Sequence, residues 1–191
     1  MSARIILASA SPRRRELLEQ IGVTCLVKPV DLDETPSMHE SPLAYVQRIA
    51  AEKSKLCLSQ SSEGLPVLAA DTAVICNEKI LGKPKDLADF LGMLRLLSGK
   101  THQVYSAVSL RGRKHWRTAS ITEVTFRIIT DQEMLAYWRT GEPLDKAGGY
   151  AIQGLGGIFA ETIKGSFSGV VGLPIFETAE LLSKQGINIL E

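Results

Sequence analysis

The chain has 191 residues, of which 45% are hydrophobic and 23% are charged, and its formal net charge is +1. This composition suits a single globular domain with a substantial core over residues 1–191, with room for two lobes around a cleft. A net charge near zero provides no global field that would attract nucleic acid, and no apolar run approaches the ~20 residues that a membrane span needs. We therefore expect neither a nucleic-acid partner nor a membrane partner.

The cysteines and the start of the chain favour a reducing, cytoplasmic setting. The three cysteines are odd in number and widely spaced, and no CxxC or Cys/His zinc spacing occurs. They are typical of reduced core thiols. Arg4 precedes only a short apolar stretch without a cleavage pattern, so we expect no signal peptide.

The first predicted elements are a short strand, a tight turn and a helix. Residues 5–9 are apolar and β-rich, which is typical of a buried strand. Ser11 suits a helix N-cap, and Pro12 suits the first helical position because its missing N–H is not needed there. Apolar residues then repeat at helical spacing until Gly22, where we expect the helix to end.

The later elements follow the same hydrophobic periodicities. Helices are expected at 42–59, 86–99, 131–139 and 174–184, and strands at 25–30, 67–76, 104–110 and 121–129. A further short strand is expected within 77–84, and another at Val170 and Val171 after a glycine-rich segment. Strands and helices alternate in the first half and a hairpin lies in the second, which predicts an α/β fold with a mixed sheet.

Three arginines open the first helix, where positive charges are disfavoured. The helix N-terminus already carries partial positive charge, and each misplaced exposed charge costs roughly 0.3–1 kcal/mol. An anion would reverse that cost, because backbone N–H groups, the helix dipole and guanidinium groups together form a phosphate site. Arg14 shares the core-facing stripe and Arg13 flanks it, whereas Arg15 lies four residues before Glu19 and suits a solvated pair. The alternative interpretation is a basic surface turn.

Asp71 lies in the middle of the apolar run VLAADTAVIC. A buried unpaired carboxylate is costly, so this side chain needs a cation, a metal or a strand end beside it. Its neighbours at two-residue spacing include Ala69 and Ala73, which leave room beside the carboxylate. The alternative is a strand break at Asp71 and Thr72, since both are common turn residues.

Lys53 falls inside the apolar stripe of the predicted helix at 42–59. Its ammonium could reach the surface along the helix, or it could meet an anion in a cleft. Glu52 borders the same stripe, but a pair with Arg48 four residues earlier explains it.

Further charged residues complete the ingredients of a metal–polyphosphate site. Lys83 lies between Gly82 and Pro84, and Lys146 stands at the mouth of the glycine-rich segment. The acidic loop that follows the strand at 25–30 offers carboxylates suited to Mg²⁺ or Mn²⁺, although such a loop can simply be solvated. The collected set is Ser9, Arg13, Arg14, Lys53, Lys83 and Lys146 against Glu34 and Asp71. The stretch QGLGG matches neither a P-loop nor a GxGxxG site.

Several stretches of the chain resemble the Maf family of nucleoside triphosphate pyrophosphatases. They are LASASPRRRELL, AEKSK, AADTAV, GKPKD, PLDKAGGYAIQGLGG and VVGLP, in that order and over almost the whole chain. The resemblance implies hydrolysis of a nucleoside triphosphate to the monophosphate and pyrophosphate, with a divalent metal as cofactor. It also implies an elongated mixed sheet flanked by helices, with two lobes around a deep cleft, similar to the inosine triphosphatases.

The resemblance also implies roles for residues in the matching motifs. Asp71 matches the family's proton acceptor, and Glu34 and Asp71 would serve the metal and the attacking water. The phosphate-holding residues would be Ser9, Arg13, Arg14, Lys53 and Lys83, with Lys146 beside the substrate. Lys53 and Lys83 also count as catalytic in this assignment.

Three positions, Arg13, Thr72 and Gln153, look like those of the dTTP/UTP subgroup, with modified pyrimidine nucleotides as further substrates. Gln153 offers the donor and the acceptor that a pyrimidine edge requires. The family is also linked to inhibition of septum formation, so the alternative function is a non-catalytic nucleotide-binding regulator of cell division. A homodimer is compatible with the family, and the sequence does not decide it.

Overall fold

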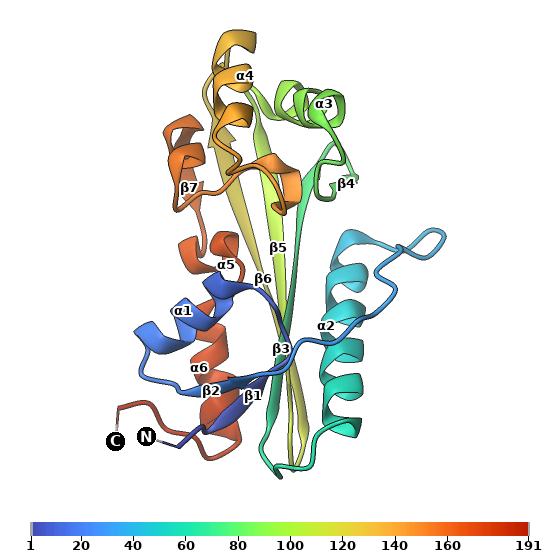
Figure 1. Ribbon diagram of the computed structural model, residues 1–191, viewed down its shortest axis with the longest axis vertical. Helices are drawn as coiled ribbons and strands as arrows, with labels where there is room; N and C mark the ends of the chain where they lie inside the picture. Colours follow the sequence, from blue (N-terminus) through green and yellow to red (C-terminus); the bar gives the residue numbers. More distant parts are fainter. Residues whose placement is uncertain (1, 191) are drawn as a thin grey trace. The chain divides into compact units, whose positions relative to one another are not determined.

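The computed structural model describes residues 2–190, and among these a seven-stranded mixed sheet flanked by helices forms the framework (Figure 1). The strand order is β2-β1-β3-β5-β6-β7, with β4 pairing on β3. The strands are β1 Ile5–Leu7, β2 Cys25–Val27, β3 Val67–Cys76, β4 Lys79–Leu81, β5 Thr101–Arg111, β6 His115–Phe126 and β7 Ala160–Lys164. Strand β1 pairs in parallel with β2 and β3, whereas β4 on β3 and β7 on β6 are antiparallel, which makes the sheet mixed as predicted.

The helices follow the strands along the chain. They are α1 Pro12–Gln20, α2 Pro42–Ser59, α3 Leu87–Leu97, α4 Asp131–Arg139, α5 Phe167–Val171 and α6 Ile175–Lys184, with 3-10 turns η1 Ala147–Gly149 and η2 Leu155–Phe159. Local capping explains several of the helix starts. The Ser41 hydroxyl accepts from the Ala44 N–H before α2, and Thr130 and Glu133 form a reciprocal capping box before α4. No helix within residues 2–190 is both long and apolar enough to cross a bilayer.

The chain divides into two compact units. The first comprises the residues up to Asp71, residues 106–120 and the residues from Gly172 onward, and the second comprises residues 72–105 and 121–171. Strands β3, β5 and β6 each contribute residues to both units, because the boundaries fall within them. The assignment of residues 1–191 to a single domain stays a prediction.

Strand β1 is the centre of the first unit's core. Its three residues are fully buried, and the register places Ile6 beside Val67 of β3. Cys57 of α2 packs against the same apolar cluster, so α2 is held against the sheet. Cys57 and Cys76 are buried free thiols, as expected of core cysteines, whereas Cys25 is a half-buried free thiol outside the buried core.

Aromatic side chains dominate the core of the second unit. Phe90 of α3 and Tyr137 of α4 lie 6.2 Å apart between ring centroids, and Tyr137 and Phe159 lie 5.2 Å apart. The same cluster includes Val74 from β3 and Phe126 from β6. Packing of this kind fixes the segment around residue 150, because Tyr150 is 95% buried within the cluster and its hydroxyl lies 2.8 Å from His102 Nε2.

Two sequence predictions of strands need correction. The strand expected at 121–129 begins earlier, at His115, and ends at Phe126, because residues 115–120 extend the hairpin with β5 despite their polar character. The strand expected at Val170 and Val171 is wrong, since both residues lie in α5. There the Ser166 hydroxyl accepts from the Gly169 N–H at 3.0 Å, and this local contact favours a helical turn over the β preference of valine.

Candidate active site

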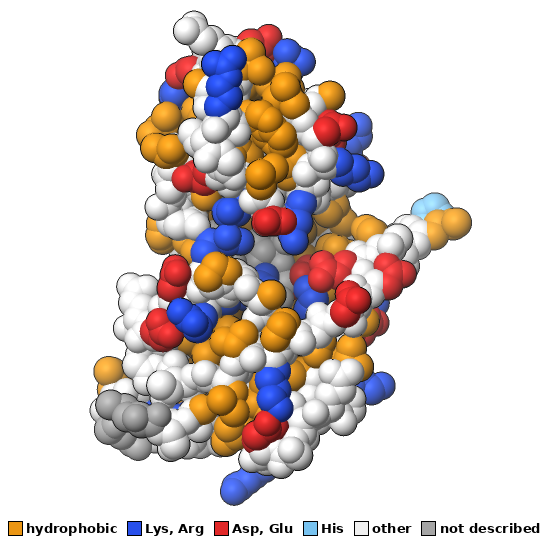
Figure 2. All heavy atoms as spheres, in the orientation of Figure 1, with side chains coloured by type: hydrophobic (Ala, Val, Ile, Leu, Met, Phe, Trp, Pro, Cys, Tyr) orange, Lys and Arg blue, Asp and Glu red, His pale blue; other side chains and the backbone are white. Residues whose placement is uncertain are grey.

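Lys53 of α2 joins two carboxylates at the centre of the candidate site. The side chain is buried on the apolar face of the helix, and its Nζ lies 2.9 Å from Asp71 Oδ1 and 2.7 Å from Glu34 Oε1. The alternative in which the Lys53 ammonium reaches the surface along the helix is therefore wrong. Glu34 belongs to the acidic loop before α2, and half of its side chain is exposed. Figure 2 shows Asp and Glu side chains gathered along that loop.

Asp71 lies within an uninterrupted strand. Strand β3 runs from Val67 to Cys76, so the alternative of a break at Asp71 and Thr72 is wrong. Burial raises the pKa of the Asp71 carboxyl above its ordinary value, while the charges of Lys53 and Arg14 oppose that rise. The site thus holds a carboxylate that is harder to keep ionised than one in water.

Arg14 is fixed by two hydrogen bonds at the start of α1. Its Nε donates to the Gly172 carbonyl oxygen at 2.9 Å, and its Nη1 donates to Ser9 Oγ at 3.1 Å. Burial lowers the pKa of the guanidinium, and the negative charge of Asp71 opposes that effect. Arg15, by contrast, is exposed and pairs with Glu19 at 3.3 Å. The predicted pair of Arg15 with Glu19 is confirmed, whereas the phosphate-binding role of Arg14 stays a prediction.

Arg48 anchors the acidic loop, a role that the sequence analysis missed. Its Nε and Nη2 donate to the two oxygens of Glu40 at 2.7 and 2.8 Å, and Nη2 also reaches the Thr35 carbonyl oxygen at 3.2 Å. The expected pair with Glu52 is present as well, at 3.2 Å. Thr35 follows Glu34 directly, so Arg48 holds the backbone beside Glu34. No local spacing signal links Arg48 to a loop residue eight positions earlier.

Glu34 and Asp71 have the donor chemistry that a divalent metal requires. Their oxygens converge on one ammonium nitrogen, so the two carboxylates already gather around a single positive charge. Mg²⁺ is commonly bound by one or two carboxylates together with substrate phosphates. Within residues 2–190 no group of three His, Cys, Asp or Glu residues is arranged to hold a metal without such help. The residues therefore fit a metal that arrives with a phosphate-bearing ligand.

Arg13 is the second residue of α1, in the first unit, and is half-buried. The other predicted residues belong to the second unit. Thr72 is half-buried and follows Asp71 in β3, whereas Lys83 and Gln153 are exposed. The Lys146 ammonium donates to the Leu144 carbonyl oxygen at 3.2 Å. The predicted residues thus form two sets, one in each unit.

A backbone hydrogen bond joins two segments of the second unit that carry predicted residues. The Gly148 N–H donates to the Gly82 carbonyl oxygen at 2.9 Å, which brings the segment of Lys83 beside the segment of Lys146. Gly148 has a positive φ of 69°, and an added Cβ would lie 3.0 Å from the Val74 side chain. Glycine is therefore required for this close approach.

Two backbone amides of the glycine-rich segment, those of Leu155 and Gly156, donate hydrogen bonds within the protein. The Glu142 carboxylate accepts from the Leu155 N–H at 3.0 Å and the Gly156 N–H at 2.9 Å, and from the Tyr137 hydroxyl at 2.7 Å. These amides therefore do not resemble the open anion cradle of a P-loop. Only the absence of P-loop spacing pointed to this result in the sequence, and the role of Glu142 had no sequence signal.

Comparison with known proteins gives a family match and two similar relatives. The model of the family described as "Maf-like protein" matches residues 4–185. A dTTP/UTP pyrophosphatase of Saccharophagus degradans is 52% identical over 186 residues, covering 95% of this chain and 88% of the relative. A dTTP/UTP pyrophosphatase of Escherichia coli O6:K15:H31 is 51% identical over 180 residues, covering 94% of this chain and 91% of the relative.

Solved structures give weaker likenesses. A nucleoside-triphosphatase (dITP/XTP pyrophosphatase) of Mycobacterium abscessus matches with 16% identity and a TM-score of 0.41, over 64% of this chain and 72% of that one. The Ham1 protein of Staphylococcus aureus matches with 16% identity and a TM-score of 0.45, over 64% of this chain and 71% of that one. The family model and the two relatives together establish that the chain belongs to the Maf family.

Proposed function

We propose that the protein hydrolyses dTTP and UTP to the nucleoside monophosphate and pyrophosphate. The observation that carries the proposal is the buried ion pair of Lys53 and Asp71, with Arg14 close enough to influence the pKa of the same carboxyl. The names of the curated relatives at 51–52% identity support the substrate and the bond that is broken. We propose a cytoplasmic setting, where such substrates are found.

In the proposed reaction, water attacks the α-phosphorus and the bond to the departing pyrophosphate breaks. Asp71 takes the proton from the water. A carboxyl at its ordinary pKa of 3.8 is a weak base, and burial raises the pKa of Asp71 toward the range in which it accepts a proton more readily. Lys53 holds the carboxylate oriented through its 2.9 Å contact.

The phosphate groups are held by cations in this proposal. Arg13 and Arg14 bind them at the start of α1, where the helix dipole also favours negative charge. Ser9 contributes by fixing Arg14, whose Nη1 lies 3.1 Å from the hydroxyl. Lys83 and Lys146 are assigned to the phosphate-binding set by the motifs GKPKD and PLDKAGGYAIQGLGG that contain them.

Mg²⁺ or Mn²⁺ is the proposed cofactor, and Glu34 and Asp71 would hold it. When bound beside phosphates, such a metal neutralises their charge and lowers the pKa of a bound water. Lys53 keeps the two carboxylates together in the protein without substrate.

Selectivity for pyrimidines is assigned to Arg13, Thr72 and Gln153. The exposed Gln153 amide offers both a donor and an acceptor to the base edge, and modified pyrimidine nucleotides present a similar edge. Rejection of purines would then depend mainly on size.

The proposal is tested by product analysis with a panel of dTTP, UTP, dCTP, ATP and GTP in the presence of Mg²⁺ or Mn²⁺. We expect pyrophosphate release from dTTP and UTP, and no turnover when the metal is chelated. Release of orthophosphate would indicate cleavage at the γ-phosphate and would overturn the proposal. Tight nucleotide binding without hydrolysis would favour the non-catalytic regulator instead.

A further inference from the structure

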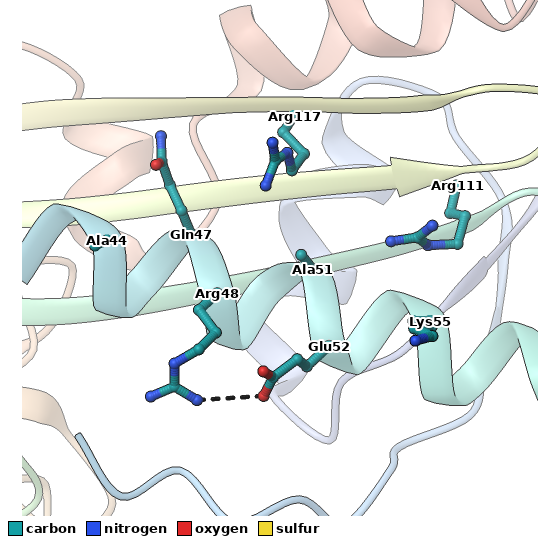
Figure 3. Close-up of a pocket in the computed structure, with 8 residues that line it drawn as sticks. All are labelled: Ala44, Gln47, Arg48, Ala51, Glu52, Lys55, Arg111 and Arg117. Atoms are coloured by element: carbon teal, nitrogen blue, oxygen red, sulfur yellow. Dashed lines mark hydrogen bonds and ion pairs between the residues drawn. The ribbon is translucent and has the colours of Figure 1, made fainter. Parts of the chain in front are cut away.

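A basic pocket of about 390 Å³ lies within the first unit, between α2 and the hairpin end of β5 and β6 (Figure 3). Its lining residues are Ala44, Gln47, Arg48, Ala51, Glu52, Lys55, Arg111 and Arg117. Figure 3 shows Arg111 and Arg117 coming from the strands and Gln47 coming from the helix. Of these residues only Arg48 also serves the candidate active site, where it anchors the acidic loop through Glu40 and the Thr35 carbonyl oxygen.

Three cations of this pocket have no carboxylate partner among the described residues 2–190. Arg48 is matched by Glu40 and Glu52, but Lys55, Arg111 and Arg117 form no ion pair within residues 2–190. Burial lowers the pKa of the Arg111 guanidinium, and the charge of Arg117 lowers it further. Like charges from three different elements therefore face one pocket without internal compensation.

Arg111 contacts a hydrogen-bonded group made of two serine hydroxyls and a histidine ring. Ser54 Oγ and Ser109 Oγ lie 2.8 Å apart, and both serines are fully buried. Ser109 Oγ also lies 2.8 Å from His115 Nε2, and Arg111 reaches Ser54 Oγ at 3.4 Å and His115 Nε2 at 3.3 Å. These contacts order the Arg111 guanidinium before any ligand binds, which lowers the entropy cost of binding.

We propose that this pocket is a second anion site, distinct from the candidate active site, that binds a small molecule carrying a diphosphate group. One phosphoryl group carries about −1.5 to −2 charge near neutral pH, which does not balance three cations, whereas a diphosphate comes closer. The volume suits a small ligand rather than an extended polymer. The overall net charge of +1 likewise gives a nucleic acid little attraction.

The site is tested by titration of the whole protein, without divalent metal, while NMR follows the side-chain amide of Gln47. The probes are inorganic diphosphate and uridine 5′-diphosphate, with sulfate at equal ionic strength as the reference. We expect saturable shifts of Gln47 with a diphosphate and not with sulfate. Tighter binding of one probe identifies the free ion or the nucleotide as the source, and either result supports the site.

Variants separate this pocket from its surroundings. R117Q removes an exposed cation that lines the pocket. We expect it to raise the dissociation constant of the diphosphate about tenfold, as loss of one charge-assisted contact does. R113Q removes an exposed arginine of the same hairpin that does not line the pocket, and it should leave binding unchanged. R14Q, in the candidate active site, should leave the Gln47 shifts intact.

Four results would overturn the inference. The first is the absence of a saturable Gln47 shift with either diphosphate. The second is equal weakening by R113Q and R117Q, which would indicate diffuse surface charge. The third is a response to a single-stranded oligonucleotide alone. Loss of the Gln47 shifts in R14Q would assign them to the candidate active site and would also contradict a second site.

Discussion

Lys53 and Asp71 form an ion pair in which both side chains are almost completely buried, with Nζ 2.9 Å from Oδ1. Removing two charges from water costs several kcal/mol per ion, so such a pair is weak support for stability. It is costly to break, however, because the remaining partner stays buried and uncompensated. We therefore infer that Lys53 and Asp71 are charged because the function of the protein needs them, and not because the pair stabilises the fold.

Replacing Asp71 with asparagine removes the negative charge and keeps the size of the side chain. We expect D71N to lose turnover of dTTP, because an amide does not accept the proton from water. We also expect a loss of about 1–3 kcal/mol in the free energy of unfolding, because Lys53 then keeps only the half-exposed Glu34 as an ionic partner. Turnover and urea denaturation without ligand measure the two effects.

The double variant K53M/D71N provides the matched control. Removing both charges should recover part of the stability that D71N loses, because no buried ion is left unpaired. A D71N protein that unfolds early but retains wild-type turnover would show that Asp71 is structural, and another base would be needed.

The pKa of Asp71 should respond in opposite directions to its two charged neighbours. R14Q removes a cation that lowers the pKa and should raise it, whereas E34Q removes an anion that raises it and should lower it. Carboxyl carbon NMR of the substrate-free protein measures both. A wild-type value at or below the ordinary 3.8, or shifts of the same sign in the two variants, would contradict the electrostatic analysis.

The sign of the stability effect follows from the same pKa. Folding raises the pKa of Asp71, so the folded protein binds more protons than the unfolded chain between the two values. The contribution of this carboxyl to the free energy of unfolding therefore decreases as pH rises from 3.8 through the folded-state pKa. Ionisation of Asp71 thus costs stability at neutral pH, and D71N does not recover this cost because it leaves the buried Lys53 ammonium without Asp71 as a partner.

Local patterns in the sequence predicted much of the framework. The bounds of α2, β3 and α4 follow from hydrophobic period and from caps, which act over a few residues. The charges of Lys53 and Asp71 also stood out, because each interrupts an apolar stripe. Their pairing could not be derived, since it depends on how α2 lies against β3 in the folded chain.

Contacts between distant segments account for what the sequence did not predict. Glu142 reaches the amides of Leu155 and Gly156, and Arg48 reaches Glu40, through loops whose conformation has no local periodicity. The helix α5 replaced an expected strand because one serine hydroxyl supports a turn that the two valines alone do not suggest. Side-chain to backbone contacts of this kind override weak propensities.

Arg14 and Arg15 should differ sharply when each is changed to alanine. R14A is expected to reduce kcat/KM by roughly 10²-fold, because in the proposed reaction it removes a fixed cation beside the developing negative charge. R15A removes only an exposed pair with Glu19 and should leave kcat/KM nearly unchanged. Steady-state kinetics with dTTP measures both variants. Equal losses would refute the assignment of Arg14 to the phosphate site.

Gly156 should not tolerate a side chain. An added Cβ would lie 2.6 Å from Tyr137 Oη and 2.9 Å from the Ala151 nitrogen, so G156A should cost about 1–3 kcal/mol of unfolding free energy. G92A is the control, because no atom lies within 4 Å of the added Cβ in α3, and there alanine should stabilise the helix by about 0.5–1 kcal/mol. Equal stability of the two variants by urea denaturation would contradict the tight packing of Gly156.

Arg48 should control the metal dependence through the loop that carries Glu34. Its contacts with Glu40 and with the Thr35 carbonyl oxygen fix the backbone next to Glu34, so R48A should leave that carboxylate without a fixed position. Loss of such an orienting contact typically reduces metal affinity or activity by about 10–100-fold. If Mg²⁺ is the cofactor, as proposed, the Mg²⁺ concentration for half-maximal activity should rise accordingly, with a smaller change in the maximal rate.

The control for R48A is E52Q, which removes the other partner of Arg48 and leaves the loop contacts intact. E52Q should keep the Mg²⁺ dependence of the wild-type protein. The contact with Arg48 lowers the pKa of Glu40 from 4.5 to about 2, so its contribution is present above pH 4.5 and is lost as the pH falls toward 2. At neutral pH both variants therefore test an intact Glu40 carboxylate. If R48A and E52Q raised the Mg²⁺ requirement equally, the loop anchor would not be the cause, because only R48A releases the loop.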